Sequence, residues 1–383
     1  MHWINNIRLP TPFTANADCC WSVLLDSRDI VRSIEPSSSS IDKEENWHGD
    51  WLSPMGLDLQ INGGLGVSFN ALDREDLPNI NKLLDRLWME GVDEICPTIV
   101  TCSLSSLRKS LGVLHQARKR VSDKSCRLIG AHLEGPFLSR DYVGAHDSDF
   151  LINPTLSSLH ERIQEFETEI AIVTLAPELL GSFEVVQKLI DLGVVVSLGH
   201  SGADAELSSL AFDHGVSMIT HAFNAMPGIH HRSPGPLGEA IANGDISIGL
   251  IADGIHVHPK VLKILQKLAP EKIVLVSDAL SPYGLAQEKF QWNDRSLIVK
   301  NNFCSLEDGT LVGTTLSLLA ACKRFAKWTN QNSAAIWSAT VAPRIALNKG
   351  DTVQDFLVGK SLNQLLRWNL DIESEELTWN HAK

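Results

Sequence analysis

Carboxylate and imidazole side chains recur in this 383-residue chain directly after short apolar segments, and three of them could bind a metal. Glu134, His200 and His221 each follow such a segment. A carboxylate and two imidazoles offer three ligands to a divalent cation and leave one position open for water, which is typical of catalytic zinc. Any one of these histidines is more simply interpreted as a satisfied loop residue. Three such groups after successive apolar segments favour a metal site.

Two further polar residues follow the same kind of segment and could act on a substrate. Asp278 ends the last apolar segment, where a carboxylate beside a metal's water could take its proton and pass it to a leaving group. A helix cap or turn is the simpler interpretation of such an aspartate. His146 lies on a Gly-containing loop after Glu134. It could polarise a substrate carbonyl or be a surface histidine, and the sequence leaves both open.

A possible anion site lies in the second half of the chain. Arg232 is part of the polar loop 228–236, and its planar guanidinium suits a phosphate group. Asn224 and Ala225 offer backbone N–H groups just after an apolar segment, and His256 follows the next segment. In a chain of net charge −13, these donors indicate a local pocket for a phosphorylated substrate.

The elements that must position these groups alternate in type. Eight short apolar runs are separated mostly by amphipathic stretches, which predicts buried parallel strands covered by helices. Eight such repeats predict an α/β fold of the (β/α)8 TIM barrel type, in which the carboxyl ends of all strands meet at one rim. A doubly wound open sheet is the alternative, although no G-x-G-x-x-G follows a strand. The runs are Leu57–Ile61, Glu94–Thr98, Leu128–Leu133, Ile170–Ala176, Val194–Leu198, Ser217–Thr220, Ile246–Ile251 and Ile273–Ser277.

Both ends of the chain contain β-like segments and predict a second, smaller module. Residues 1–53 hold short strands joined by a polar turn after Ser37, and residues 346–383 hold possible strands at Asp351–Val358 and Leu365–Leu370. We expect these ends to form one small β-sandwich domain on a barrel of residues 54–345. The predicted helices are Leu77–Met89, Leu104–Val121, Leu156–Phe166, Leu179–Leu192, Ala203–Phe212, Val261–Leu268, Ser317–Trp328 and Ala334–Leu347, the last broken by Pro343.

Composition narrows the classes of partner and the compartment. With 33 basic against 46 acidic residues, the chain is too acidic to favour nucleic acid or an anionic membrane as its main partner. Its seven cysteines are odd in number and form no C-x-x-C, which is typical of reduced thiols. No signal peptide or run of about 20 apolar residues is present. We therefore expect a cytoplasmic, soluble protein.

Short motifs throughout the chain add a resemblance to a known family. The segments HLEGP, VTLAPE and THAFNAMP appear in the order found in N-acetylglucosamine-6-phosphate deacetylases of the amidohydrolase superfamily. The resemblance extends from about residue 54 to about residue 359. The matching segments are Pro54–Gly63, His132–Pro136, Gly144–His146, Val173–Glu178, Gly199–Ser201, Thr220–Pro227, Ala252–Val257, Ser277–Ala279 and Gly309–Thr314.

The resemblance implies an activity and a role for each candidate residue. The expected reaction is hydrolysis of the acetamide of N-acetyl-D-glucosamine 6-phosphate to D-glucosamine 6-phosphate and acetate, in amino-sugar catabolism or recycling. The matching positions imply the metal-bound water as nucleophile and Asp278 as general base and then acid, with His146 facing the substrate. By the same match, the metal ligands are Glu134, His200 and His221, and the sugar phosphate contacts are Asn224, Ala225, Arg232 and His256.

The resemblance also implies the metal content and an assembly. Gln60 and Asn62 occupy the positions where many amidohydrolases have an H-x-H pair, so the chain resembles the branch with one metal ion. Zinc is the expected ion, with iron, cobalt or manganese as alternatives. In this family part of the phosphate site can come from a neighbouring subunit, which implies a homodimer or homotetramer. A different amidohydrolase and a non-catalytic sugar-phosphate sensor are the alternative functions.

Overall fold

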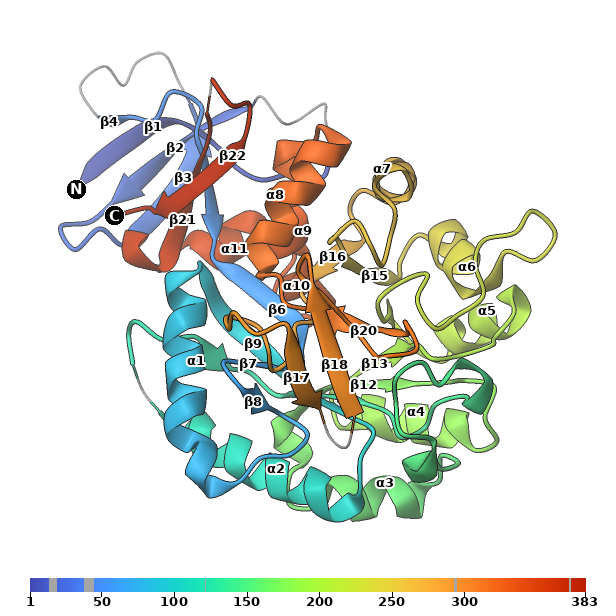
Figure 1. Ribbon diagram of the computed structural model, residues 1–383. Helices are drawn as coiled ribbons and strands as arrows, with labels where there is room; N and C mark the ends of the chain where they lie inside the picture. Colours follow the sequence, from blue (N-terminus) through green and yellow to red (C-terminus); the bar gives the residue numbers. More distant parts are fainter. Residues whose placement is uncertain (14–18, 38–44, 121, 293–294, 372) are drawn as a thin grey trace.

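The computed structural model describes residues 1–13, 19–37, 45–120, 122–292, 295–371 and 373–383. Its centre is a sheet of parallel strands, each of which pairs with the next along the chain (Figure 1). Each of the eight predicted apolar runs overlaps one of these strands, so the predicted positions of the barrel strands are confirmed. The strands are β6 (Gly56–Ile61), β9 (Val92–Val100), β11 (Ala131–Glu134), β12 (Ile170–Leu175), β13 (Val195–Leu198), β14 (Met218–Ile219), β15 (Ser247–Ile251) and β16 (Ile273–Val276).

The first and last strands meet, so the sheet closes on itself. The Asp278 backbone N–H donates to the Gln60 carbonyl at 2.9 Å. The Ser277 N–H donates to the buried Asp58 carboxylate at 3.1 Å. Burial, opposed by this and other hydrogen bonds, raises the pKa of Asp58 to about 7. These bonds across β6 and β16 exclude the open doubly wound sheet and confirm the (β/α)8 barrel.

Helices pack around the outside of the strands. In α1 the buried residues Ile80, Leu83, Leu84 and Leu87 recur every three or four positions, so one face packs on the sheet. The helix α6 was not predicted, because its sequence begins with Gly and Pro and continues a polar loop. The helices are α1 (Leu77–Met89), α2 (Leu104–Arg118), α3 (Leu156–Ile163), α4 (Ser182–Asp191), α5 (Ala205–Asp213), α6 (Gly235–Asn243), α7 (Pro259–Leu268), α8 (Leu318–Thr329), α9 (Asn332–Thr340) and α10 (Ala342–Ala346).

An antiparallel sheet is inserted between the last barrel strand and α8, and the sequence did not predict it. Its strands pair in chain order and lie in front of the barrel strands in Figure 1. The insertion therefore adds a wall to one end of the barrel. Its strands are β17 (Lys289–Trp292), β18 (Arg295–Lys300), β19 (Phe303–Ser305) and β20 (Leu311–Thr314).

Strands from both termini share one sheet, as the sequence predicted. Its order is β22-β21-β5-β1-β2-β3, with β4 paired to β1. The predicted turn after Ser37 lies at 38–44, outside the described residues, and the boundaries of the β module stay a prediction. The strands are β1 (His2–Arg8), β2 (Cys20–Leu25), β3 (Val31–Pro36), β4 (Glu45–Asn46), β5 (Trp51–Pro54), β21 (Leu365–Leu370) and β22 (Leu377–His381); short strands β7 (Gly63–Gly64), β8 (Val67–Ser68) and β10 (Arg127–Leu128) lie elsewhere.

One predicted strand near the C-terminus is wrong. The segment Asp351–Val358 contains the short helix α11 (Val353–Leu357). Thr352 accepts from the Asp355 N–H, and Asp355 accepts from the Thr352 N–H, which forms a capping box. This local hydrogen bonding favours a helix where the apolar residues alone suggested a strand.

The sequence led us to expect no membrane-spanning segment and only reduced cysteines. No helix within the described ranges is both long and apolar enough to cross a lipid bilayer. All seven cysteines are free thiols, four of them buried.

Candidate active site

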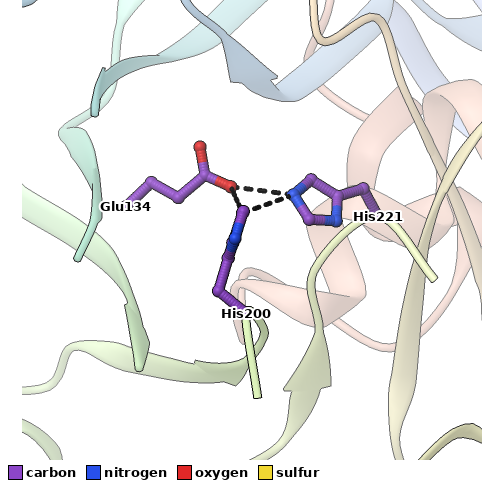
Figure 2. A group of neighbouring side chains, drawn as sticks. All are labelled: Glu134, His200 and His221. Atoms are coloured by element: carbon purple, nitrogen blue, oxygen red, sulfur yellow. Dashed lines mark hydrogen bonds and ion pairs between the residues drawn. The ribbon is translucent and has the colours of Figure 1, made fainter. Parts of the chain in front are cut away.

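Three side chains predicted as metal ligands meet inside the barrel rim. Glu134 ends β11, and His200 and His221 lie two residues beyond β13 and β14. Glu134 Oε1 lies 3.2 Å from His200 Nε2 and 2.9 Å from His221 Nε2, and the two Nε2 atoms are 3.1 Å apart (Figure 2). All three residues are buried. The barrel thus brings together one carboxylate oxygen and two imidazole nitrogens.

The donor set fits a divalent cation. His200 Nδ1 lies 2.9 Å from the Tyr142 carbonyl, to which it donates its proton, so Nε2 keeps a free lone pair. Burial alone would raise the pKa of Glu134, but the adjacent imidazoles of His200 and His221 hold that pKa well below its usual range. The same carboxylate raises the pKa of His221 against the opposing effect of burial. An ionised carboxylate and two converging nitrogen lone pairs are the ligands that zinc and similar ions prefer.

The backbone is strained at the residues that carry this chemistry. His200, His221 and Asp278 have φ values of +50°, +25° and +46°, in the left-handed region that non-glycine residues rarely adopt. Such conformations cost free energy and concentrate at functional sites, where the surrounding fold holds them. Three strained residues, just beyond the ends of β13, β14 and β16, mark this rim as a site whose geometry was favoured over local stability.

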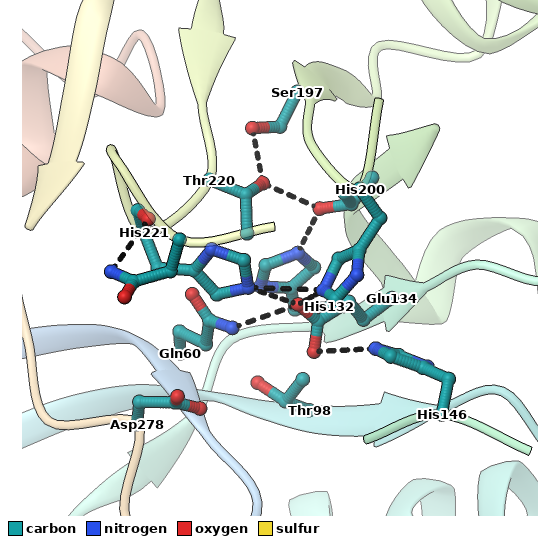
Figure 3. Close-up of polar contacts among 12 residues, drawn as sticks. Gln60, Thr98, His132, Glu134, His146, Ser197, His200, Thr220, His221 and Asp278 are labelled. Carbon is teal, nitrogen blue, oxygen red and sulfur yellow. Dashed lines mark hydrogen bonds and ion pairs between the residues drawn. The ribbon is translucent and has the colours of Figure 1, made fainter. Parts of the chain in front are cut away.

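Asp278 lies in the same cavity, and a neighbouring amide holds its carboxylate. Asn62 Nδ2 donates to Asp278 Oδ1 at 2.6 Å. Burial and the nearby Glu134 charge raise the pKa of Asp278 to about 6. A carboxyl group with a pKa near neutrality is suited to accept a proton and return it. Figure 3 shows Asp278 with the histidines and Glu134 on the rim.

His146 also faces the cavity, as a neutral donor. Its Nδ1 accepts from the Thr101 N–H at 3.3 Å, so the ring proton is on Nε2, which is 3.8 Å from Glu134 Oε2. Burial, together with the nearby imidazole of His200, lowers the pKa of His146 to about 3. The ring is therefore uncharged at neutral pH and can donate a hydrogen bond from Nε2. Of the two interpretations left open by the sequence, the surface histidine is excluded by burial.

The cavity at this rim has a volume of about 210 Å³ and takes in most of the predicted site. Asn224, Ala225 and His256 line it together with the groups described above. The sequence analysis did not single out Asp253, whose Oδ2 lies 2.7 Å from His256 Nδ1 and fixes the ring. The signal was present, because Asp253 lies three residues before His256, in the same motif.

Arg232 is the predicted site residue that the structure does not bring to this cavity. It lies on the exposed loop before α6 and is absent from the cavity wall. Its Nη1 lies 2.8 Å from His231 Nε2. Within one chain, therefore, Arg232 is a surface cation.

A polar network beside the candidate metal ligands was also missed by the sequence analysis (Figure 3). The buried His132 contacts the Leu59 carbonyl through Nδ1 at 2.9 Å and Thr174 Oγ1 through Nε2 at 2.7 Å. The Thr174 hydroxyl is hydrogen-bonded to the Thr220 hydroxyl, which is also hydrogen-bonded to the Ser197 hydroxyl. Burial lowers the pKa of His132, so its ring is neutral. The network links the strands β6, β11, β12 and β13 next to the candidate ligands.

Comparison with known proteins points to one family. No protein-family model matches the chain. The N-acetylglucosamine-6-phosphate deacetylase of Mus musculus is 34% identical over 295 residues, which cover 74% of this chain and 70% of that protein. The N-acetylgalactosamine-6-phosphate deacetylase of Escherichia coli O157:H7 is 30% identical over 86% of both chains. A crystal structure of N-acetylglucosamine-6-phosphate deacetylase from Thermotoga maritima superposes with a TM-score of 0.79, at 26% identity, over 99% of this chain and 98% of that one.

Proposed function

The chain belongs to the N-acetylglucosamine-6-phosphate deacetylase family, and we propose that it hydrolyses N-acetyl-D-glucosamine 6-phosphate to D-glucosamine 6-phosphate and acetate. The observation that carries this proposal is the meeting of Glu134, His200 and His221 beside Asp278 in one buried cavity. A non-catalytic sensor would have no need of a proton-transferring carboxyl group beside a cation site. The reaction belongs in amino-sugar catabolism or recycling.

Glu134, His200 and His221 would hold the cation. When bound, it would activate water and polarise the amide carbonyl as a Lewis acid. We propose one ion per chain, zinc before iron, cobalt or manganese. Supporting a single ion, the amides of Gln60 and Asn62 are already used as donors to Glu134 Oε1 and Asp278 Oδ1, at 3.1 and 2.6 Å. Elemental analysis giving two ions per chain would contradict this.

Asp278 moves the protons of the reaction. It accepts a proton from the attacking water as the new C–O bond forms. It then donates that proton to the sugar nitrogen as the C–N bond breaks, so that acetate and an amine leave. His146 donates a hydrogen bond from Nε2 to the oxygen on which negative charge develops, and its neutral state keeps that proton available.

Binding of the phosphate is proposed to involve two chains. Asn224, Ala225 and His256 line the cavity and would contact the substrate from the same chain. The exposed Arg232 supports a homodimer or homotetramer in which Arg232 of the partner subunit completes the phosphate site. Phosphate binding far from the amide would fix the acetamide over the reacting groups.

Arg232→Ala tests this arrangement. A lost charge-assisted contact to phosphate costs about 1.5–3 kcal/mol, so kcat/KM should fall roughly ten- to a hundred-fold on the phosphorylated substrate. The loss should shrink for N-acetylglucosamine without phosphate, whereas equal losses would assign Arg232 to loop support. Mixed dimers of Arg232→Ala and Asp278→Asn chains should regain activity, because one of the two sites then has both residues intact.

The decisive experiment measures acetate and free amine released by metal-loaded protein from N-acetylglucosamine 6-phosphate. Parallel assays use N-acetylgalactosamine 6-phosphate, which the Escherichia coli relative makes the second candidate, and non-phosphorylated N-acetyl sugars. Faster turnover of the galacto epimer would replace the proposed substrate. Activity confined to non-phosphorylated amides would indicate a different amidohydrolase. We also propose a cytoplasmic location, supported by the seven free cysteines.

A further inference from the structure

The inserted sheet β17–β20 supplies one wall of the active-site cavity. Leu311 and Val312 of β20 line the cavity, and so do Val100 at the end of β9 and Leu280 after β16. Val312 also packs against the buried apolar cluster that contains Val100 and Leu280. The cavity therefore has one apolar side, which the proposed mechanism leaves unused.

This apolar side lies directly beside the catalytic carboxyl group. The Thr314 N–H donates to the Asp278 carbonyl at 2.9 Å, and the Leu280 N–H donates to the Thr314 carbonyl at 3.0 Å. A Cβ placed on Gly313 would lie 2.5 Å from the Asp278 carbonyl oxygen and 3.4 Å from Asp278 Oδ2. Only glycine permits this approach of the two backbones, so β20 is held against Asp278.

The chemistry of the reaction indicates which part of the substrate would contact the apolar side of the cavity. In an N-acetyl substrate the methyl group is one bond from the carbonyl carbon that water attacks, so it must lie close to Asp278. The sugar hydroxyls and the phosphate are polar and suit the polar part of the cavity wall, to which Asn224 and His256 belong. An apolar methyl group is favoured where it is removed from water against other apolar groups.

We propose that Val312, together with Val100 and Leu280, forms the pocket for the acyl group and limits that group to the size of acetyl. The inference rests on the proposed deacetylation and deepens it. A pocket of this kind discriminates by volume, and one extra methylene in such a pocket changes kcat/KM by about 10- to 200-fold. The wild-type protein should therefore prefer N-acetyl over N-propionyl glucosamine 6-phosphate by about ten-fold or more.

The test compares the two acyl substrates in variants of the metal-loaded protein. Val312→Ala removes two methyl groups from the wall and should raise the propionyl-to-acetyl ratio of kcat/KM about ten-fold. Val100→Ala should raise the same ratio and serves if the first variant fails to fold. Val299→Ala is the matched control, because Val299 packs on the same cluster but does not line the cavity. Its ratio should equal that of wild type.

The outcomes separate this inference from the proposed function. An unchanged acyl ratio in both Val312→Ala and Val100→Ala, with N-acetyl turnover intact in wild type, would overturn the acyl pocket alone. An equal rise in the Val299→Ala control would also overturn it, because the effect would then come from loosening of the sheet. Wild-type protein that releases no acetate at all would overturn the deacetylation and the pocket together.

Discussion

The two ends of the barrel differ in the partners of their buried charged side chains. At the end away from the candidate site, Arg344 donates to the Met55 carbonyl at 2.8 Å and to Asp93 Oδ1 at 2.5 Å. Glu94 there lies 3.0 Å from Lys349 Nζ and 2.6 Å from an Arg127 nitrogen. Burial would raise the pKa of Glu94, but these cations together with Arg344 lower it. Buried charges at this end are thus neutralised within the chain.

At the rim the buried carboxylate of Glu134 faces two imidazoles instead of lysine or arginine side chains. Glu134 and two imidazoles meet with their lone pairs toward one another, and three residues have left-handed backbone. His221 Nδ1 and Asn62 Oδ1 are buried without a hydrogen-bond partner among the described residues. A buried polar atom without a partner costs free energy. The comparison shows that buried charges at one end are paired with cations of the same chain, whereas the rim gathers one carboxylate and two imidazoles at a cost in stability.

The largest effect on the rim should come from removing one of its candidate metal ligands. His221→Ala should abolish metal binding and activity together, because two remaining ligands form a poor divalent site. Metal content by elemental analysis and acetate release check this. Full metal content in the purified variant would contradict the assignment of His221.

The next effect separates proton transfer from metal binding. Asp278→Asn keeps the shape of the side chain but cannot accept a proton from water, so kcat should fall about 10²- to 10⁴-fold. The metal content should match that of wild type. Near-normal kcat in a metal-loaded Asp278→Asn protein would remove Asp278 from the mechanism.

A substitution at the end of the barrel away from the candidate site should lower the free energy of unfolding and leave kcat unchanged. Arg344→Ala leaves Asp93 without its buried cation, whereas Glu94 keeps Lys349 and Arg127, so the free energy of unfolding should fall by about 3 kcal/mol, the lower end of the cost of breaking a buried pair. Urea unfolding measures the loss, and kcat below the unfolding range should stay near wild type. The exposed pair formed by Lys327 and Glu376 provides the control, since Lys327→Ala should leave the free energy of unfolding almost unchanged. A large fall in kcat for folded Arg344→Ala would contradict the view that this end of the barrel serves stability alone.

The smallest effect concerns the pH dependence of the rim. The hydrogen bond from Asn62 lowers the pKa of Asp278, against the larger effect of burial that raises it. Asp278 must be ionised to act as a base, so activity falls as the pH drops through its pKa. Asn62→Leu should therefore move the acid limb of kcat/KM to higher pH. Since bound metal is present in both proteins, only the difference between their profiles is compared, and identical limbs would contradict the role of Asn62.

Much of the fold could be predicted, for identifiable reasons. The barrel strands are short and buried on both faces, so β12 and β15 appear as nearly continuous apolar runs. The sheet β17–β20 was missed because its strands are short and β18 buries only Leu297, so it shows little apolar periodicity. The helix α11 was missed because its capping box, and not its apolar pattern, decides its conformation. Short elements stabilised by local hydrogen bonds carry little of the periodicity on which prediction depends.

The sequence by itself determined which chemical groups follow the strands, because strand order and buried periodicity are local properties of the chain. Glu134, His200, His221 and Asp278 could therefore be named in advance. Only the tertiary structure decided that Glu134 and His221, 87 positions apart, lie within hydrogen-bond distance. It also decided that Asn62 holds Asp278 from 216 positions away, and that Arg232 stays outside the cavity of its own chain. The physical reason is closure of the barrel, which brings strand ends together at distances that no local pattern encodes.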